Sequence, residues 1–143
     1  MQWGEYIGIA EQLAAANTEA HHRSAVSRSY YAAYHAAKHF VADRDRAPGS
    51  WNYAPTESRD RRGVHEGLWL KLATPPEVAS VMTMGLSLLK SRVWADYESA
   101  DSGTHQARFS ARYAQAAVLS AKEIIRRLGG AAKDSSLGSS SRT

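Results

Sequence analysis

The segment from Arg23 to Phe40 constrains the fold more than any other part of the chain. It reads RSAVSRSYYAAYHAAKHF, and its apolar side chains recur at helical spacing. Placed at about 100° per residue, they form one continuous stripe along a helix. The members of this apolar stripe are Val26, Tyr30, Ala33, Ala37 and Phe40. The pattern predicts a long helix that ends near Asp43 and buries this stripe in a core.

The opposite face of the same helix carries a polar stripe of unusual composition. Its members are Ser24, Arg28, Tyr31, His35 and His39, with Lys38 beside them. A solvated helix face is normally rich in Lys and Glu, so this composition indicates a face that is paired or functional. A flank of small side chains separates the two stripes and predicts close approach by another helix. The small flank consists of Ala25, Ser29, Ala32 and Ala36.

Helical periodicity recurs in four further segments. We expect helices over residues 3–17, 62–73, 77–97 and 104–128. In the first of them, Trp3 and Tyr6 belong to the apolar face. Gly129-Gly130 is expected to end the last helix. No segment shows the alternation of a β-strand, so the sequence predicts an all-α fold, an up-and-down bundle of four long helices plus one short helix.

These helices are expected to form a single domain over residues 1–130, followed by a disordered Ser-rich tail over residues 131–143. A long loop over residues 44–62 contains Trp51 and Tyr53 among charged residues of both signs. Loops of this length are functional or mobile. Aromatic side chains among arginines can stack bases and hold phosphates. The alternative is an exposed loop that is held in place by one tryptophan.

Composition narrows the class of protein. The chain has 143 residues and no cysteine, which excludes disulfides and thiolate metal sites. Its formal net charge of +4 fits an anionic partner without requiring one. We find no signal peptide and no apolar run of transmembrane length. The expectation is a cytoplasmic protein that does not interact with membranes.

Two motifs carry a resemblance to a known family. Residues 23–37, RSAVSRSYYAAYHAA, closely resemble the second helix of small HEPN domains (higher eukaryotes and prokaryotes nucleotide-binding). Residues 92–97, RVWADY, look like the Arg-x-x-Ala-Asp-Tyr ending of a later helix in the same group. The resemblance covers roughly residues 5–128 and implies a HEPN-like helical bundle that forms a homodimer.

The resemblance leaves two classes of function open. One is a nucleotide- or RNA-binding or interaction module, which acts with a minimal nucleotidyltransferase partner in a toxin–antitoxin or defence system. The other is a metal-independent endoribonuclease toxin that uses Arg28 and His35 in a dimeric cleft. Six residues separate this pair, which fits the Arg, four to six residues, His motif of HEPN ribonucleases. There the arginine steadies the phosphate and the histidine moves protons.

The chemistry of Arg28 and His35 suits that role. Histidine titrates near neutral pH, arginine grips phosphate with two hydrogen bonds, and the 2′-hydroxyl of RNA is a built-in nucleophile. Seven positions along a helix are almost two turns, so both side chains point the same way. The alternative is that His35 is a satisfied histidine in helix packing.

A polar network is the second candidate feature. Arg92 and Asp96 stand four residues apart on a predicted helix, so they can contact each other. Both fall on its apolar side, where unpaired charges are costly, and Arg28 is the expected third member. The network either fixes helix register or positions a ligand-binding group. We expect Tyr31, His65 and Tyr97 to join this polar seam.

Basic residues outside this network are candidates for nucleic-acid binding. They are Arg59, Arg61 and Arg62 in the loop, and Arg108 and Arg112 on the last helix with Gln115, Lys122 and Arg126. An ordinary solvated face is the alternative. We expect His21, His22 and His105 at the surface. No metal site and no cofactor are predicted, because no helical pair of histidines comes with a carboxylate at ligand spacing.

Overall fold

The computed structural model describes residues 3–44, 61–74, 76–97 and 109–140. Every regular element in these ranges is a helix, which confirms the all-α class. The helices are α1 (Trp3–Ala15), α2 (Glu19–Arg44), α3 (Arg61–Leu70), the short 3-10 helix η2 (Lys71–Ala73), α4 (Pro76–Tyr97) and α5 (Ala111–Ser140). In the described residues, no helix is long and apolar enough to cross a membrane.

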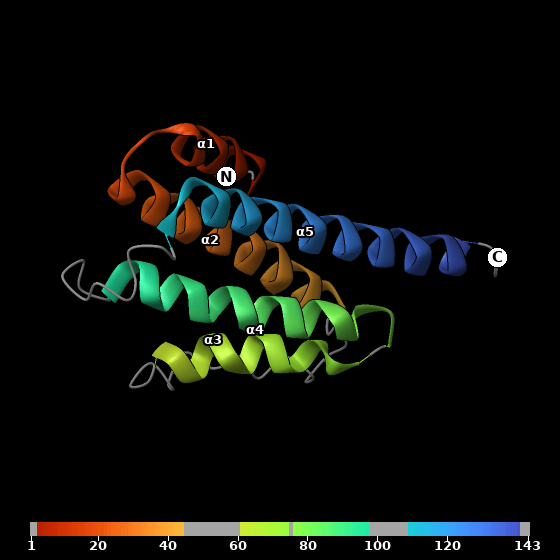
Figure 1. Ribbon diagram of the computed structural model, residues 1–143. Helices are drawn as coiled ribbons and strands as arrows, with labels where there is room; N and C mark the ends of the chain where they lie inside the picture. The colour runs from red at the N-terminus through yellow and green to blue at the C-terminus, as the bar shows by residue number, and fades with distance from the viewer. Residues whose placement is uncertain (1–2, 45–60, 75, 98–108, 141–143) are drawn as a thin grey trace.

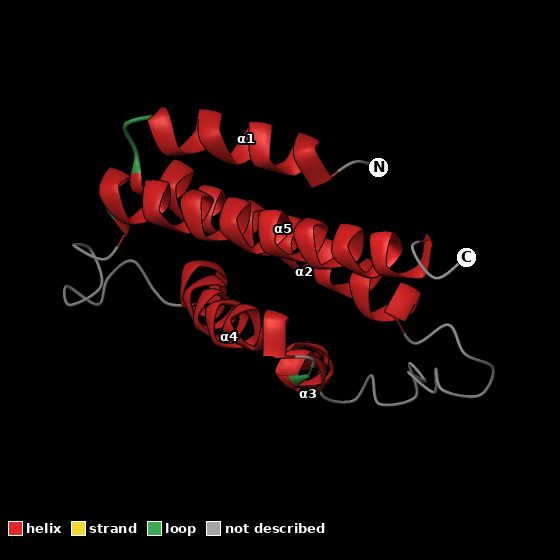
Figure 2. Cartoon of the chain, turned by 90° about the vertical axis from the view of Figure 1, so that its right-hand side faces the viewer, coloured by secondary structure: helices red, strands yellow, loops and turns green. Residues whose placement is uncertain are grey.

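The helices pack in three layers around α2 and α5, which lie side by side in the middle (Figures 1 and 2). Helix α1 covers one side of this pair, and α4 with α3 covers the other. Helices α2 and α5 run in the same direction, because Phe109, just before α5, contacts His22 at the start of α2. Helices α1 and α4 are antiparallel to α2 (Figure 1). Helix α2 contacts each of the other α-helices.

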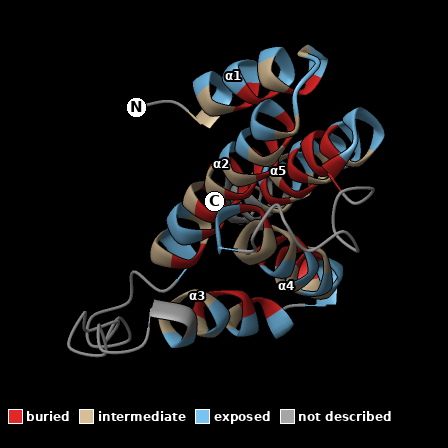
Figure 3. Cartoon of the chain, turned by 60° about the vertical axis from the view of Figure 1, so that its left-hand side comes forward, coloured by how far each residue is buried: buried red, intermediate tan, exposed pale blue. Residues whose placement is uncertain are grey.

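The apolar stripe of α2 forms the centre of the core, as predicted. Val26, Tyr30, Ala33 and Ala37 are fully buried, and Phe40 is partly buried against them. Buried positions lie on the inward sides of α2 and α5 in Figure 3. The small flank is buried as well, and its neighbours come from the same chain. One cluster joins Ala25 of that flank to Ala10 and Ala14 of α1 and to Ala114 and Val118 of α5.

Helix α3 packs on α4 through one large side chain. The ring of Trp69 is fully buried and rests on Gly85 in the middle of α4. A Cβ atom at position 85 would lie only 2.1 Å from Trp69 Cε3. Glycine in a helix interior costs about 1 kcal/mol relative to alanine. Its presence here lets the indole approach the α4 backbone.

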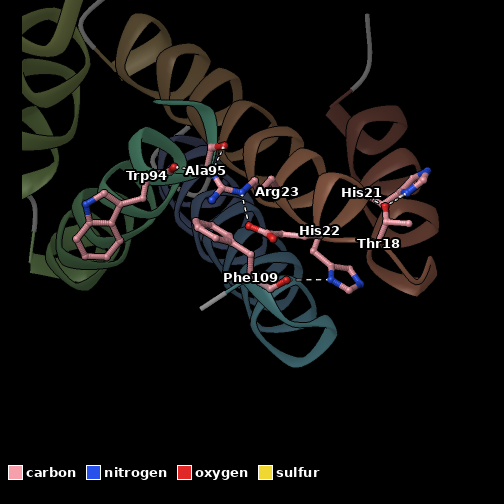
Figure 4. A network of polar contacts seen from close by, with 8 residues as sticks. Thr18, His21, His22, Arg23, Trp94, Ala95 and Phe109 are labelled. Atoms are coloured by element: carbon pink, nitrogen blue, oxygen red, sulfur yellow. Dashed lines mark hydrogen bonds and ion pairs between the residues drawn. The ribbon is translucent and has the colours of Figure 1, made fainter. Parts of the chain in front are cut away.

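The side chains of His22 and Arg23 connect the start of α2 to neighbouring segments (Figure 4). The Nδ1 atom of His22 lies 2.9 Å from the carbonyl oxygen of Phe109, and Nε2 lies 2.7 Å from that of Ala16. Arg23 Nη1 donates to the carbonyl oxygens of Trp94 and Ala95, at 3.3 Å each, at the C-terminus of α4. A cation suits that position, because the helix dipole is negative there. The expectation that His22 lies at the surface is wrong, because its side of α2 faces α5.

His22→Ala is expected to lower the free energy of unfolding by about 1–3 kcal/mol, since it leaves backbone carbonyls without their partner. Urea unfolding measures the change. The adjacent His21 is the matched control, because it is exposed and its ring contacts Thr18 of its own turn. An equal effect of His21→Ala and His22→Ala would show that the buried contacts contribute nothing.

Helix α5 differs from its predicted bounds at both ends. It begins at Ala111 rather than Thr104, and Ser110 Oγ accepts a hydrogen bond from the backbone N–H of Tyr113 at 3.2 Å, as an N-cap does. The stop predicted at Gly129-Gly130 is wrong, because α5 continues to Ser140. Neither glycine adopts a positive φ, so both extend the right-handed helix at a modest cost. Residues 131–140 of the predicted tail are therefore helical in backbone.

Candidate functional site

The polar stripe of α2 lies between the N-terminal half of α1 and the C-terminal half of α4. The ring of Tyr6 stacks on His35 with 5.8 Å between centroids, and Trp3 meets the ring of His39 at 4.8 Å. On the α4 side, Arg92 bonds to Tyr31. The sequence placed Trp3 and Tyr6 on an apolar face and did not predict these histidine contacts. Their three-residue spacing on an antiparallel helix was the available signal.

Arg92 is the centre of the polar seam. Its Nη2 donates to Tyr31 Oη at 2.5 Å, and its Nε lies 3.0 Å from Asp96 Oδ2. Although that distance is short, Nε–H makes no hydrogen bond with the carboxylate, so this contact is an ion pair. The guanidinium lies 5.1 Å from the ring centroid of Tyr31 and 5.7 Å from that of Tyr97. The structure thus brings three of the other predicted seam residues, Tyr31, Asp96 and Tyr97, together around Arg92.

The predicted contact between Arg28 and Asp96 is wrong. Asp96 instead accepts a hydrogen bond from Ser27 Oγ at 3.4 Å. One position along a helix rotates a side chain by about 100°, and this rotation turns Arg28 away from α4. Arg28 is exposed, and in the described part of the chain it pairs with no carboxylate. A guanidinium on the polar stripe is therefore accessible to an anion.

His65 joins the seam to the core through Tyr30. Tyr30 Oη accepts a hydrogen bond from Trp69 Nε1 at 3.2 Å and lies 2.6 Å from His65 Nδ1. Because the indole can only donate, the Tyr30 hydroxyl is free to donate to the imidazole. Burial raises the pKa of Tyr30 well above its ordinary value, so the hydroxyl keeps its proton. This chain of bonds connects α2 to α3.

His35 sits in an electropositive part of the stripe. Partial burial lowers its pKa from the ordinary value of 6.5, and the charges of Lys38 and His39 lower it further. The imidazole is therefore neutral at neutral pH and able to accept a proton. Its half-buried position beside Tyr6 leaves part of the ring accessible.

The lowered pKa of His35 predicts a pH dependence. A histidine whose pKa is lower in the folded state than the unfolded value of 6.5 takes up protons more readily when unfolded. Its contribution to stability is complete above about pH 6.5 and is lost as the pH falls through the folded pKa. Histidine ring signals in NMR, followed from pH 8 to 4.5, should place the midpoint of His35 below 6.5. A midpoint at or above 6.5 would contradict the burial of this ring.

The basic edge of α5 is partly neutralised within the chain. Lys122 Nζ lies 3.4 Å from Glu11 Oε2, and Arg126 Nη2 lies 2.6 Å from Glu123 Oε1. Arg112 is exposed. Arg61 and Arg62 belong to the first turn of α3. Trp51, Tyr53, Arg59, His105 and Arg108 lie outside the described residues.

Comparisons with protein-family models, with curated proteins and with solved structures found no match to this chain. Among the described residues, no group of three or more His, Asp or Glu side chains is placed to hold a metal ion. The candidate site is therefore defined by its own geometry, the polar stripe of α2 with Arg92 and its tyrosines.

Proposed function

We propose that this chain is a HEPN-type RNA- or nucleotide-binding module and that the polar stripe of α2 contacts the ligand. One observation carries the proposal: Arg28, Tyr31 and His35 share one accessible face of α2, and the exposed Arg28 has no carboxylate partner among the described residues. An uncompensated guanidinium suits a phosphate, which it binds with two hydrogen bonds.

Positive charge near His35 and an aromatic ring near Arg92 support an anionic ligand with a planar part. Lys38 adds positive charge near His35. Tyr97 is 73% exposed at the end of α4, although its ring lies 5.7 Å from the Arg92 guanidinium. Exposed aromatic rings next to basic side chains are typical of surfaces that stack nucleobases.

The resemblance supports the remaining parts of the proposal. It favours a HEPN-like up-and-down bundle, a homodimer, and a minimal nucleotidyltransferase partner in a toxin–antitoxin or defence system. The small flank of α2 gives no independent argument for the dimer, because all four of its side chains are already buried within this chain. The dimer and the partner therefore depend on the two sequence motifs alone.

Removal of one charge tests the surface. Arg28→Ala is expected to weaken binding of a labelled single-stranded RNA roughly tenfold, the loss typical of one charge-assisted hydrogen bond. The slope of log affinity against log salt should shrink by about 0.7. Arg112→Ala is the matched control, since it removes an exposed charge from α5. Fluorescence anisotropy at several salt concentrations measures both. If Arg112→Ala weakened RNA binding and Arg28→Ala did not, the binding surface would lie on α5 instead.

A metal-independent endoribonuclease is the second candidate, and the state of His35 favours it. A neutral, partly accessible imidazole two turns from an exposed arginine can act as a general base. His35 would take the proton of a ribose 2′-hydroxyl, whose oxygen attacks the adjacent phosphorus. The P–O5′ bond breaks, the 5′-oxygen takes a proton from water, and the products are a 2′,3′-cyclic phosphate and a 5′-hydroxyl. Arg28 would hold the phosphate oxygens during this step.

A further inference from the structure

The Tyr31 hydroxyl accepts a hydrogen bond, and no described residue accepts its own hydrogen. Arg92 Nη2 donates to Tyr31 Oη at 2.5 Å. Because a guanidinium can only donate, Tyr31 Oη is the acceptor and its O–H remains a donor. Among the described residues, this hydroxyl makes no other hydrogen bond. The polar stripe therefore presents a hydroxyl donor that can bond to an acceptor on a ligand.

Tyr31 lies between the two other chemical groups of the stripe. Arg28 precedes it by three positions and His35 follows it by four. Side chains at these spacings are neighbours on one helix face, with Cβ atoms about 5–6 Å apart. Arg28 is exposed, while Tyr31 and His35 are half-buried. Arg28 and Tyr31 therefore share a face of α2, with the Tyr31 hydroxyl on its α4 side and the long Arg28 side chain able to extend toward it.

Arg92 fixes the hydroxyl and strengthens it as a donor. The ion pair with Asp96 at 3.0 Å anchors the guanidinium, whose carbon lies 5.1 Å from the Tyr31 ring centroid. A cation that bonds to the oxygen of a hydroxyl polarises its O–H bond. The pairing also compensates the negative charge of Asp96, which would otherwise repel an anion on the same side of α2.

We propose that Tyr31 donates its hydroxyl hydrogen to a non-bridging oxygen of a phosphate held by Arg28. Arg28 and Tyr31 then form one phosphate-binding unit, and Arg92 is the residue that positions it. This inference rests on the proposed function and names the group that the stripe recognises. The chemistry is shared by a phosphodiester of RNA and the phosphate of a free mononucleotide.

Tyr31→Phe tests the unit, because it removes the hydroxyl and keeps the ring beside Arg92. Tyr113→Phe is the matched control, since it removes a phenolic hydroxyl that bonds to Ser91 Oγ, outside the polar stripe. The probes are a single-stranded RNA with hydroxyl groups at both ends, and AMP. Tyr31→Phe is expected to weaken binding of one or both probes roughly tenfold, and Tyr113→Phe less than about twofold. With uncharged methylphosphonate linkages at the bound positions, both proteins should bind more weakly, and the difference between wild type and Tyr31→Phe should shrink.

The outcomes separate this inference from the proposed function. A loss confined to RNA assigns a phosphodiester, and a loss for AMP assigns a free nucleotide. Equal affinity of wild type and Tyr31→Phe for both probes overturns the inference and leaves the proposed function standing. A wild-type protein that binds neither probe overturns both. If Tyr31→Phe does not fold, the ¹³Cζ signal of Tyr31 in the wild type decides, since it must shift when a probe binds the hydroxyl.

Discussion

Gly85→Ala is expected to lower the free energy of unfolding by about 3 kcal/mol, a large loss for a domain of this size. The added Cβ would stand 2.1–2.4 Å from three atoms of the Trp69 ring. The ring is fully buried and rigid, so α3 and α4 must move apart. This cost exceeds the gain of about 1 kcal/mol that alanine brings to a helix interior.

Gly8→Ala in α1 is the control for this substitution. Nothing lies within 4 Å of a Cβ atom at position 8, which is exposed, so this variant should be neutral or up to about 1 kcal/mol more stable. Urea unfolding of both variants gives the comparison. Trp69→Leu combined with Gly85→Ala should lose less than the sum of the two single variants, because the smaller side chain relieves the clash. Strictly additive losses would show that the two residues do not meet.

His35→Ala is expected to have the largest effect on activity if the chain cleaves RNA. Removal of the general base should lower the cleavage rate by about 10²–10⁴, while the half-buried position of His35 should keep the fold nearly as stable. Cleavage should persist in EDTA and require the 2′-hydroxyl, so an all-DNA substrate should survive.

Thermal melting and RNA cleavage have to be measured on the same His35→Ala and Arg28→Ala samples. A folded His35→Ala that loses an EDTA-resistant activity supports the endoribonuclease. Activity that falls in step with melting temperature instead assigns His35 to helix packing. If the wild type cleaves no RNA in a broad panel, the isolated chain is not a ribonuclease and binding remains the proposal.

The buried and polar faces of α2 could be predicted because apolar residues and polar residues each recur at helical spacing along the same segment. Val26 and Tyr30 are buried where the apolar stripe places them. The Arg92–Asp96 pair follows from four-residue spacing alone. Spacing within one helix does not give the angle at which a second helix crosses it. For that reason the prediction chose Arg28 as the partner of Asp96, although Ser27 occupies that place.

Other features depend on contacts between distant segments. A histidine at a helix start is usually solvated, and the carbonyl of Phe109 that holds His22 lies 87 positions away. Gly129-Gly130 carries the local signal of a helix end, but glycine also tolerates the helical conformation that it adopts here. A lone glycine in the periodic pattern of α4 was the available signal for the Trp69 contact.

NMR of the wild-type protein tests most directly whether the polar stripe of α2 binds the ligand. Unlabelled single-stranded RNA is titrated while the side-chain signals of Arg28, Tyr31 and His35 are followed. We predict that the signals of these three side chains shift together along one saturable curve, while the guanidinium signal of Arg112 on α5 does not shift. A saturating titration that shifts Arg112 and leaves the stripe unchanged would contradict the assignment of this surface.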